Sequence, residues 1–223
     1  MDFNDYPDAD MMMLSLARQL SRELREALAR RDRALFAVPG GMTPGPVFDL
    51  LAAVDLEWER IDVIPGDERW LPEGHPRSNA GQIRARLLRG KAAPARLIPL
   101  WRPLPRPEDA LEDITAEVAP LLPVDVALVG MGADMHTASL FPGADRLAEA
   151  LAHDAPPVLP MTGPGVPEPR MTLTVPVLKG AYALHVLITG DEKRRALEKA
   201  VRMDPMQAPI AALLHDATVH WAP

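Results

Sequence analysis

The sequence lacks cysteine altogether, which excludes disulfide bonds, thiolate catalysis and cysteine-based zinc sites. It also lacks apolar runs that approach the roughly 20 residues of a membrane-spanning helix. Lysine and arginine number 24 against 31 aspartates and glutamates, without a basic cluster, so we expect neither a nucleic-acid partner nor a membrane partner. The first residues, with Asp2 and Asp5, are acidic where a signal peptide would be basic, and we therefore expect a cytoplasmic protein.

The composition provides enough apolar material for one substantial core. Apolar residues make up 48% of the 223 residues and charged residues 25%, which fits one domain spanning residues 1–223. The net charge of -7 does not exclude a small anionic ligand. At short range, the attraction of an anion to a few cations and backbone amides in a cleft exceeds its repulsion by a diffuse negative surface.

Short apolar or β-branched runs alternate with amphipathic stretches along the chain, which is typical of βαβ units. This pattern predicts a three-layer α/β fold with a mostly parallel sheet flanked by helices. Helices are expected at about 11–31, 46–54 and 78–88. Strands are expected at 34–38, 61–64, 124–129, 170–175, 182–189 and 218–221.

Two segments, 101–107 and 155–169, are so rich in proline that neither can be a central strand or a helix. We expect both to be connecting loops, and the second is long enough to form a lid. Ligands of open α/β sheets bind beyond the carboxyl ends of the strands, so the residues directly after each strand are the candidates for a site.

The first candidate follows the strand at 34–38 and contains Gly40, Gly41, Met42 and Thr43. Glycines between a strand and a helix let backbone N–H groups converge on an anion, to which the helix N-terminus adds its partial positive charge. The pattern therefore predicts a phosphate cradle. An ordinary tight turn would use the same glycines, and this alternative stays open.

The second candidate is Asp67, Glu68 and Arg69, at the end of the strand at 61–64 and ahead of Ser78, which is expected to cap a helix. Two carboxylates and a guanidinium at this place could orient hydroxyl groups and bind an anion. The alternative is a solvated turn with a local ion pair, which is the more common role of a short charge run.

The most specific motif is the stretch 130–143, which follows the strand at 124–129. Asp134 and His136 lie two residues apart in a loop that opens with glycines. The carboxylate can orient the imidazole or a substrate hydroxyl while the imidazole transfers a proton, so we predict a general-base site. The alternative is the capped start of a helix with a solvent-exposed histidine.

These motifs resemble the 6-phosphogluconolactonase family, within the wider group of glucosamine-6-phosphate deaminases and ribose-5-phosphate isomerases. The resemblance implies the modified Rossmann fold of that group. It rests on segments that follow one another in the family's order: 40–44, 67–69 with 78–79, 130–143, 170–176 and 190–193.

The resemblance implies hydrolysis of 6-phosphogluconolactone to 6-phosphogluconate, the second step of the oxidative pentose phosphate pathway, by a monomer or homodimer without metal or organic cofactor. It implies His136 as the base that activates water and Asp134 as the residue that orients the imidazole or the substrate. Arg69 would lie on the lactone side or also help bind anionic groups. The substrate and phosphate would be bound by Gly40, Gly41, Met42, Thr43, Asp67, Arg170 and Lys193.

Some positions depart from the family's pattern. Pro39 stands where the family often has serine, and Met42 offers a phosphate only its amide. Met135 replaces a common glycine, so we expect the backbone there to avoid positive φ or to carry strain. The remaining histidines are interpreted as structural rather than metal-binding: His75, His153, His185, His215 and His220.

Two other functions remain to be weighed. A glucosamine-6-phosphate deaminase usually carries a catalytic glutamate five residues after the histidine, where this sequence has Phe141. A non-catalytic sugar-phosphate sensor would need an attached output module such as a helix-turn-helix. The sequence starts only about ten residues before the first expected helix, so we expect no such module.

Overall fold

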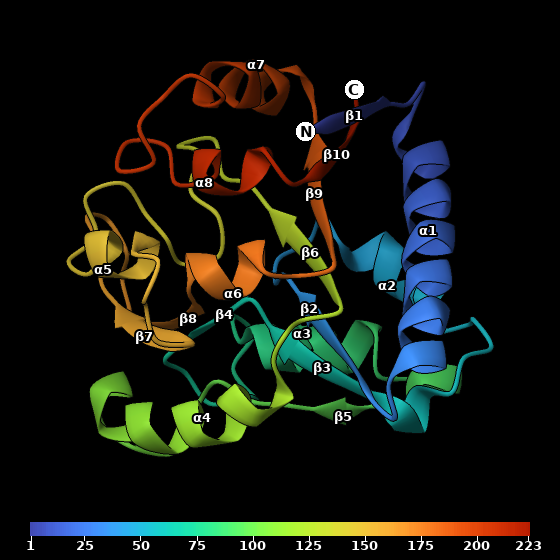
Figure 1. Cartoon of the computed structure of the whole chain (residues 1–223), viewed down its shortest axis with the longest axis horizontal. Coiled ribbons are helices and arrows are strands. Elements are labelled where there is room, and N and C mark those ends of the chain that lie inside the picture. Colours follow the sequence, from blue (N-terminus) through green and yellow to red (C-terminus); the bar gives the residue numbers. More distant parts are fainter.

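Seven parallel strands form the central sheet of the computed structural model, which describes residues 1–223 (Figure 1). In pairing order they are β1 (Asp2–Asp5), β10 (Thr218–Ala222), β9 (Ala183–Thr189), β6 (Val126–Gly130), β2 (Ala34–Val38), β3 (Ile61–Pro65) and β5 (Arg96–Leu97). The parallel arrangement brings the carboxyl ends of these strands to one end of the sheet, where the loops that follow them can meet.

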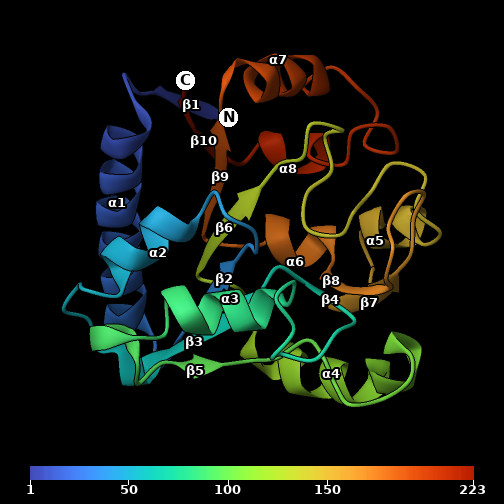
Figure 2. The ribbon, with the colours of Figure 1, turned by 180° about the vertical axis from the view of Figure 1, so that it is seen from behind.

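Both faces of the central sheet are covered, because side chains alternate along its strands between two hydrophobic cores. In β2, Leu35 and Ala37 belong to one core, whereas Phe36 and Val38 belong to the other. The Phe36 face packs against α1 (Ala9–Arg30), α2 (Gly45–Leu51) and α3 (Asn79–Arg86). The Leu35 face packs against α4 (Leu111–Val118), α5 (Leu147–Leu151), α6 (Val175–Lys179), α7 (Asp191–Ala200) and α8 (Ala211–Leu214) (Figures 1 and 2).

A second, antiparallel sheet lies beside the central one, and the sequence did not reveal it. Its order is β4 (Asp67–Arg69), β8 (Arg170–Leu173) and β7 (Val158–Met161). The expectation that 155–169 is only a connecting loop is therefore wrong for residues 158–161. Pro160 is tolerated in β7 because β7 is an edge strand that pairs with β8 alone.

The expected three-layer α/β fold is confirmed, and most element bounds differ from the expected ones by only a few residues. The strand at 34–38 is found as expected, and Ser78 caps α3 by accepting a hydrogen bond from the Gly81 amide. The strand expected at 170–175 ends at Leu173. None of the helices combines the length and apolar character that a membrane crossing requires.

Candidate active site

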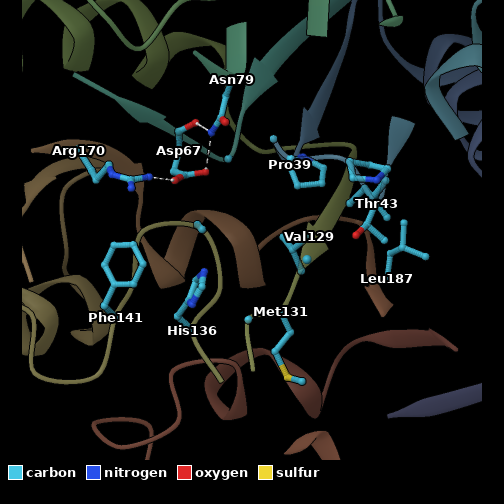
Figure 3. A pocket seen from close by; sticks show the side chains of 18 of the residues that line it. Pro39, Thr43, Asp67, Asn79, Val129, Met131, His136, Phe141, Arg170 and Leu187 are labelled. Carbon is cyan, nitrogen blue, oxygen red and sulfur yellow. Dashed lines mark hydrogen bonds and ion pairs between the residues drawn. The ribbon is translucent and has the colours of Figure 1, made fainter. Parts of the chain in front are cut away.

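A pocket of about 360 Å³ opens at the carboxyl ends of β2, β6 and β9, next to the small sheet (Figure 3). Met42 and Asp134 do not line it, although both were expected in the site. Met42 is 90% exposed, whereas Asp134 contacts His136, which does line the pocket. The other expected residues all line it: Gly40, Gly41, Thr43, Asp67, Arg69, His136, Arg170 and Lys193.

Asp134 holds the imidazole of His136 in one orientation. Its Oδ1 lies 2.5 Å from Nδ1 of His136 and also accepts a hydrogen bond from the His136 backbone amide at 3.3 Å. An ionised carboxylate can only accept, so the proton of the neutral ring lies on Nδ1. The other ring nitrogen, Nε2, contacts no protein donor or acceptor and has a free lone pair. The imidazole can therefore accept a proton from a group in the pocket.

The backbone around this pair is tightly constrained. A Cβ atom on Gly132 would lie 2.2 Å from Nδ1 of His136 and 2.5 Å from Oδ1 of Asp134, so only glycine fits beneath them. Met135 has φ of 66°, which is the strained alternative that the sequence left open. Its amide donates to the Gly132 carbonyl and its carbonyl accepts from the Ile210 amide, and both bonds hold this conformation. No helix begins between residues 130 and 143.

The glycine loop offers only part of the expected set of amides. The Gly41 amide donates to Oε1 of Gln82 at 2.9 Å, so a protein side chain already uses this donor. The amides of Met42 and Thr43 donate to no protein acceptor. Gly41 has φ of 88°, which favours glycine, and a Cβ on Gly40 would lie 1.8 Å from Oδ1 of Asn79.

Asp67 and Glu68 do not form a solvated turn, because they are 8% and 0% exposed. The carboxylate of Asp67 lines the pocket and accepts hydrogen bonds from Oγ of Ser139 at 2.5 Å and Nδ2 of Asn79 at 3.1 Å. The Ser139 bond ties β4 to the loop that carries His136, and the Asn79 bond ties it to the start of α3.

Glu68 faces away from the pocket, contrary to the idea that both carboxylates could orient hydroxyl groups of a ligand. Its two oxygens accept from the backbone amides of Arg69, Asn79 and Ala80 and from the Ser78 hydroxyl. Burial raises the pKa of this carboxyl, and the amide hydrogen bonds oppose the rise. Glu68 therefore anchors the start of α3 to the small sheet.

Arg170 is a buried cation at the edge of the pocket, with 11% of its side chain exposed. Its nearest carboxylates are Glu168 at 3.4 Å and Asp67 at 3.8 Å. Burial lowers the pKa of Arg170, and the charges of Arg69 and Arg77 lower it further against the effect of the two carboxylates. A guanidinium stays charged at neutral pH despite such a shift, so Arg170 can attract an anion.

The sequence matches the family described as glucosamine-6-phosphate isomerases/6-phosphogluconolactonase over residues 7–221. The chain belongs to this family. A protein of Pseudomonas aeruginosa named 6-phosphogluconolactonase is 42% identical over 93% of this chain and 89% of its own length. One of the same name from Mesorhizobium japonicum is 40% identical over 100% of this chain and 95% of its own length.

Among solved structures, a 6-phosphogluconolactonase from Shewanella baltica has a TM-score of 0.95 with this chain. It is 26% identical, and the match covers 100% of this chain and 98% of that one. The family resemblance expected from the motifs is thus confirmed over nearly the whole sequence.

The glucosamine-6-phosphate isomerases/6-phosphogluconolactonase family includes isomerases as well as lactonases, and the pocket holds few groups for proton transfer. Asp67 is the one carboxylate that lines it, and both its oxygens accept hydrogen bonds from the protein. Phe141 occupies the position where the deaminases usually have glutamate, and its ring lies 4.8 Å from that of His136 between centroids. His136 is therefore the pocket group best placed to accept a proton.

Several contacts at the site in this family member were not foreseen from the sequence. Glu168 pairs with both Arg77 and Arg170, although it lies in the proline-rich segment interpreted as a loop. Gln82 reaches the Gly41 amide from α3. No sequence motif signals the contacts of Glu168 with Arg77 and of Gln82 with Gly41, because each joins residues that are far apart in the chain. No group of three or more histidines and carboxylates is arranged to hold a metal ion.

Proposed function

We propose that the chain hydrolyses 6-phosphoglucono-1,5-lactone to 6-phosphogluconate, with His136 as the general base. The observation that carries this proposal is the pairing of Nδ1 of His136 with Asp134, which leaves Nε2 free beside a pocket lined by Arg69, Arg170 and Lys193. The base suits an uncharged electrophile such as a lactone carbonyl, and the three cations suit an anionic group on the same substrate. The relatives from Mesorhizobium japonicum and Pseudomonas aeruginosa, both named 6-phosphogluconolactonase, support the same substrate.

The reaction proceeds through addition and elimination at the lactone carbonyl. Nε2 of His136 takes a proton from water as the water oxygen bonds to C1, and the carbonyl electrons move to the oxygen. Arg69 is assigned to the developing oxyanion, since a fixed cationic donor stabilises that charge in the transition state. The electrons of the oxyanion then re-form the C1 carbonyl as the bond between C1 and the ring oxygen breaks, and the imidazolium gives its proton to that oxygen. Asp134 stabilises the imidazolium in between.

The phosphate is assigned to the Thr43 amide, the Thr43 hydroxyl, Arg170 and Lys193. The Thr43 amide donates to no protein acceptor, and all three residues line the pocket. Binding energy from the phosphate would place the lactone ring against His136 and so increase the rate of the chemical step. Because β1 and β10 join both ends of the sequence in one sheet, we assign this activity to a single domain over residues 1–223.

The test is lactone hydrolysis, measured with enzymatically generated 6-phosphogluconolactone against its spontaneous opening. His136→Ala is expected to lower kcat by about a factor of 10² to 10⁴, the usual contribution of a general base. The matched control is His153→Ala, because His153 is exposed and does not line the pocket. Unphosphorylated gluconolactone should be a poor substrate. No acceleration by the wild type over spontaneous opening would refute the proposal.

A further inference from the structure

The ring of Phe141 contacts two functional groups of the pocket at once. Its centroid lies 4.8 Å from the centroid of the His136 imidazole, with 48° between the ring planes. Cζ of Arg170 lies over the same ring, 5.7 Å from its centroid. Figure 3 shows Phe141 below Arg170 and beside His136. The ring thus links a pocket cation to the base.

Phe141 is itself held in place by its surroundings. Its carbonyl accepts a hydrogen bond from the Ala144 amide at 3.0 Å, which closes a turn directly after the ring. A Cβ on Gly163 would lie 3.5 Å from Cβ of Phe141, so the segment after β7 passes close to it. The ring also packs against the larger hydrophobic core. These contacts make it a rigid support.

Arg170 lacks a close carboxylate partner that would fix its guanidinium. The ion pairs with Glu168 and Asp67 are 3.4 and 3.8 Å long, beyond the range of a charge-assisted hydrogen bond, and its Nε is buried without an acceptor. The aromatic face of Phe141 is therefore a third contact for this cation, of the kind that a planar guanidinium favours.

We propose that Phe141 is a positioning residue that sets the guanidinium of Arg170 and the imidazole of His136 relative to each other. Substrate anchored at Arg170 then meets the base in one geometry. The other charged groups at the pocket are Asp134 on the imidazole, Asp67 and Arg69 from β4, and Lys193 from α7. The inference rests on the proposed lactonase function and adds a residue that none of the motif-based assignments gave a role.

The first test compares variants with and without the ring. Phe141→Leu and Phe141→Met keep an apolar side chain of similar size but lose the aromatic face, whereas Phe141→Tyr retains it. Loss of the ring should raise KM for the phosphorylated lactone about fivefold, the size of one cation–π contact. It should also lower kcat about tenfold, because the base is no longer well placed. The tyrosine variant should stay within about twofold of wild type in both constants.

The second test is a double-mutant cycle with Arg170→Gln, which removes the cation above the ring. If Phe141 acts on substrate binding through Arg170, adding Phe141→Leu to Arg170→Gln should leave KM unchanged, while kcat should still fall. With unphosphorylated gluconolactone, Phe141→Leu should lower kcat without raising KM. A residue with only a structural role would not raise KM for the phosphorylated lactone alone.

Thermal unfolding of every variant identifies those that have lost the fold, and Phe141→Met replaces Phe141→Leu if the latter unfolds. The proposal is overturned if a folded ringless variant keeps wild-type constants, or if the tyrosine variant is as impaired as the ringless ones. Additive effects on KM in the cycle would also overturn it. Failure of the proposed function would instead be seen as no turnover by the wild type.

Discussion

Replacing His220 by glutamine is expected to make the protein less sensitive to acid. His220 is fully buried in a chain of hydrogen bonds that joins β10, β9 and α1. Nε2 of His185 lies 2.7 Å from the Glu23 carboxylate, which only accepts, so His185 donates there. Nδ1 of His185 lies 3.1 Å from Nε2 of His220, and Nδ1 of His220 lies 3.0 Å from the Tyr6 hydroxyl. Both ring nitrogens of His220 therefore have a partner in this buried chain.

Burial, together with the neighbouring charge of His185, lowers the pKa of His220 from 6.5 to about 4. Between these values the unfolded chain binds a proton that the folded protein does not. The free energy of unfolding therefore falls as the pH falls from 6.5 towards 4. The difference of 6.5 − 4 = 2.5 pKa units corresponds to about 3 kcal/mol over the whole range, of which about 2 kcal/mol is lost by pH 5.

The assay is urea unfolding followed by tryptophan fluorescence at pH 7 and pH 5. His220→Gln removes the titrating group but keeps an amide that can hydrogen-bond to both neighbours. His215→Gln is the matched control, since the His215 side chain is 89% exposed. The loss of unfolding free energy from pH 7 to pH 5 should be smaller in His220→Gln than in the control by about 2 kcal/mol. Equal losses in the two variants would refute the reasoning.

Two further substitutions test the packing of the site. Gly132→Ala should lower kcat about 100-fold, because the new Cβ would lie 2.2 Å from the His136 ring. Gly74→Ala is the control, because a Cβ on Gly74 would have no atom within 4 Å. Similar kcat values for the two variants would contradict this prediction. Glu68→Gln should lower the free energy of unfolding by about 3 kcal/mol, because the NH2 group of the glutamine would face the buried backbone N–H donors of Asn79 and Ala80. Melting curves check it against the surface substitution Glu73→Gln, and equal melting temperatures would count against the role of Glu68.

Five strands of the central sheet, β2, β3, β6, β9 and β10, could be predicted from the sequence, as could β8 of the small sheet. The strands β1, β5, β4 and β7 could not. Strands such as β2 are continuous apolar runs, because both faces of the central sheet are buried. β4 is three polar residues and β7 contains Pro160, so neither has the pattern of a strand. Their strand character depends on pairing with β8, which is a tertiary contact.

The same distinction applies to the site. His136 and Asp134 lie within one motif, so their pairing could be inferred from a spacing of two residues. The contact of Gln82 with Gly41 spans 41 residues, and that of Arg77 with Glu168 spans 91. Contacts of this kind depend on how the elements pack, which no local pattern encodes.

The position of β10 between β1 and β9 has a consequence for the order in which the protein folds during synthesis. β1 is made first but pairs only with β10, the strand made last. Until residues 218–222 leave the ribosome, β1 has no partner, and β9 presents an open edge to which other chains could add. The sheet can thus be completed only after residues 218–222 have been made, and a chain that stalls before β10 would be exposed to aggregation and degradation.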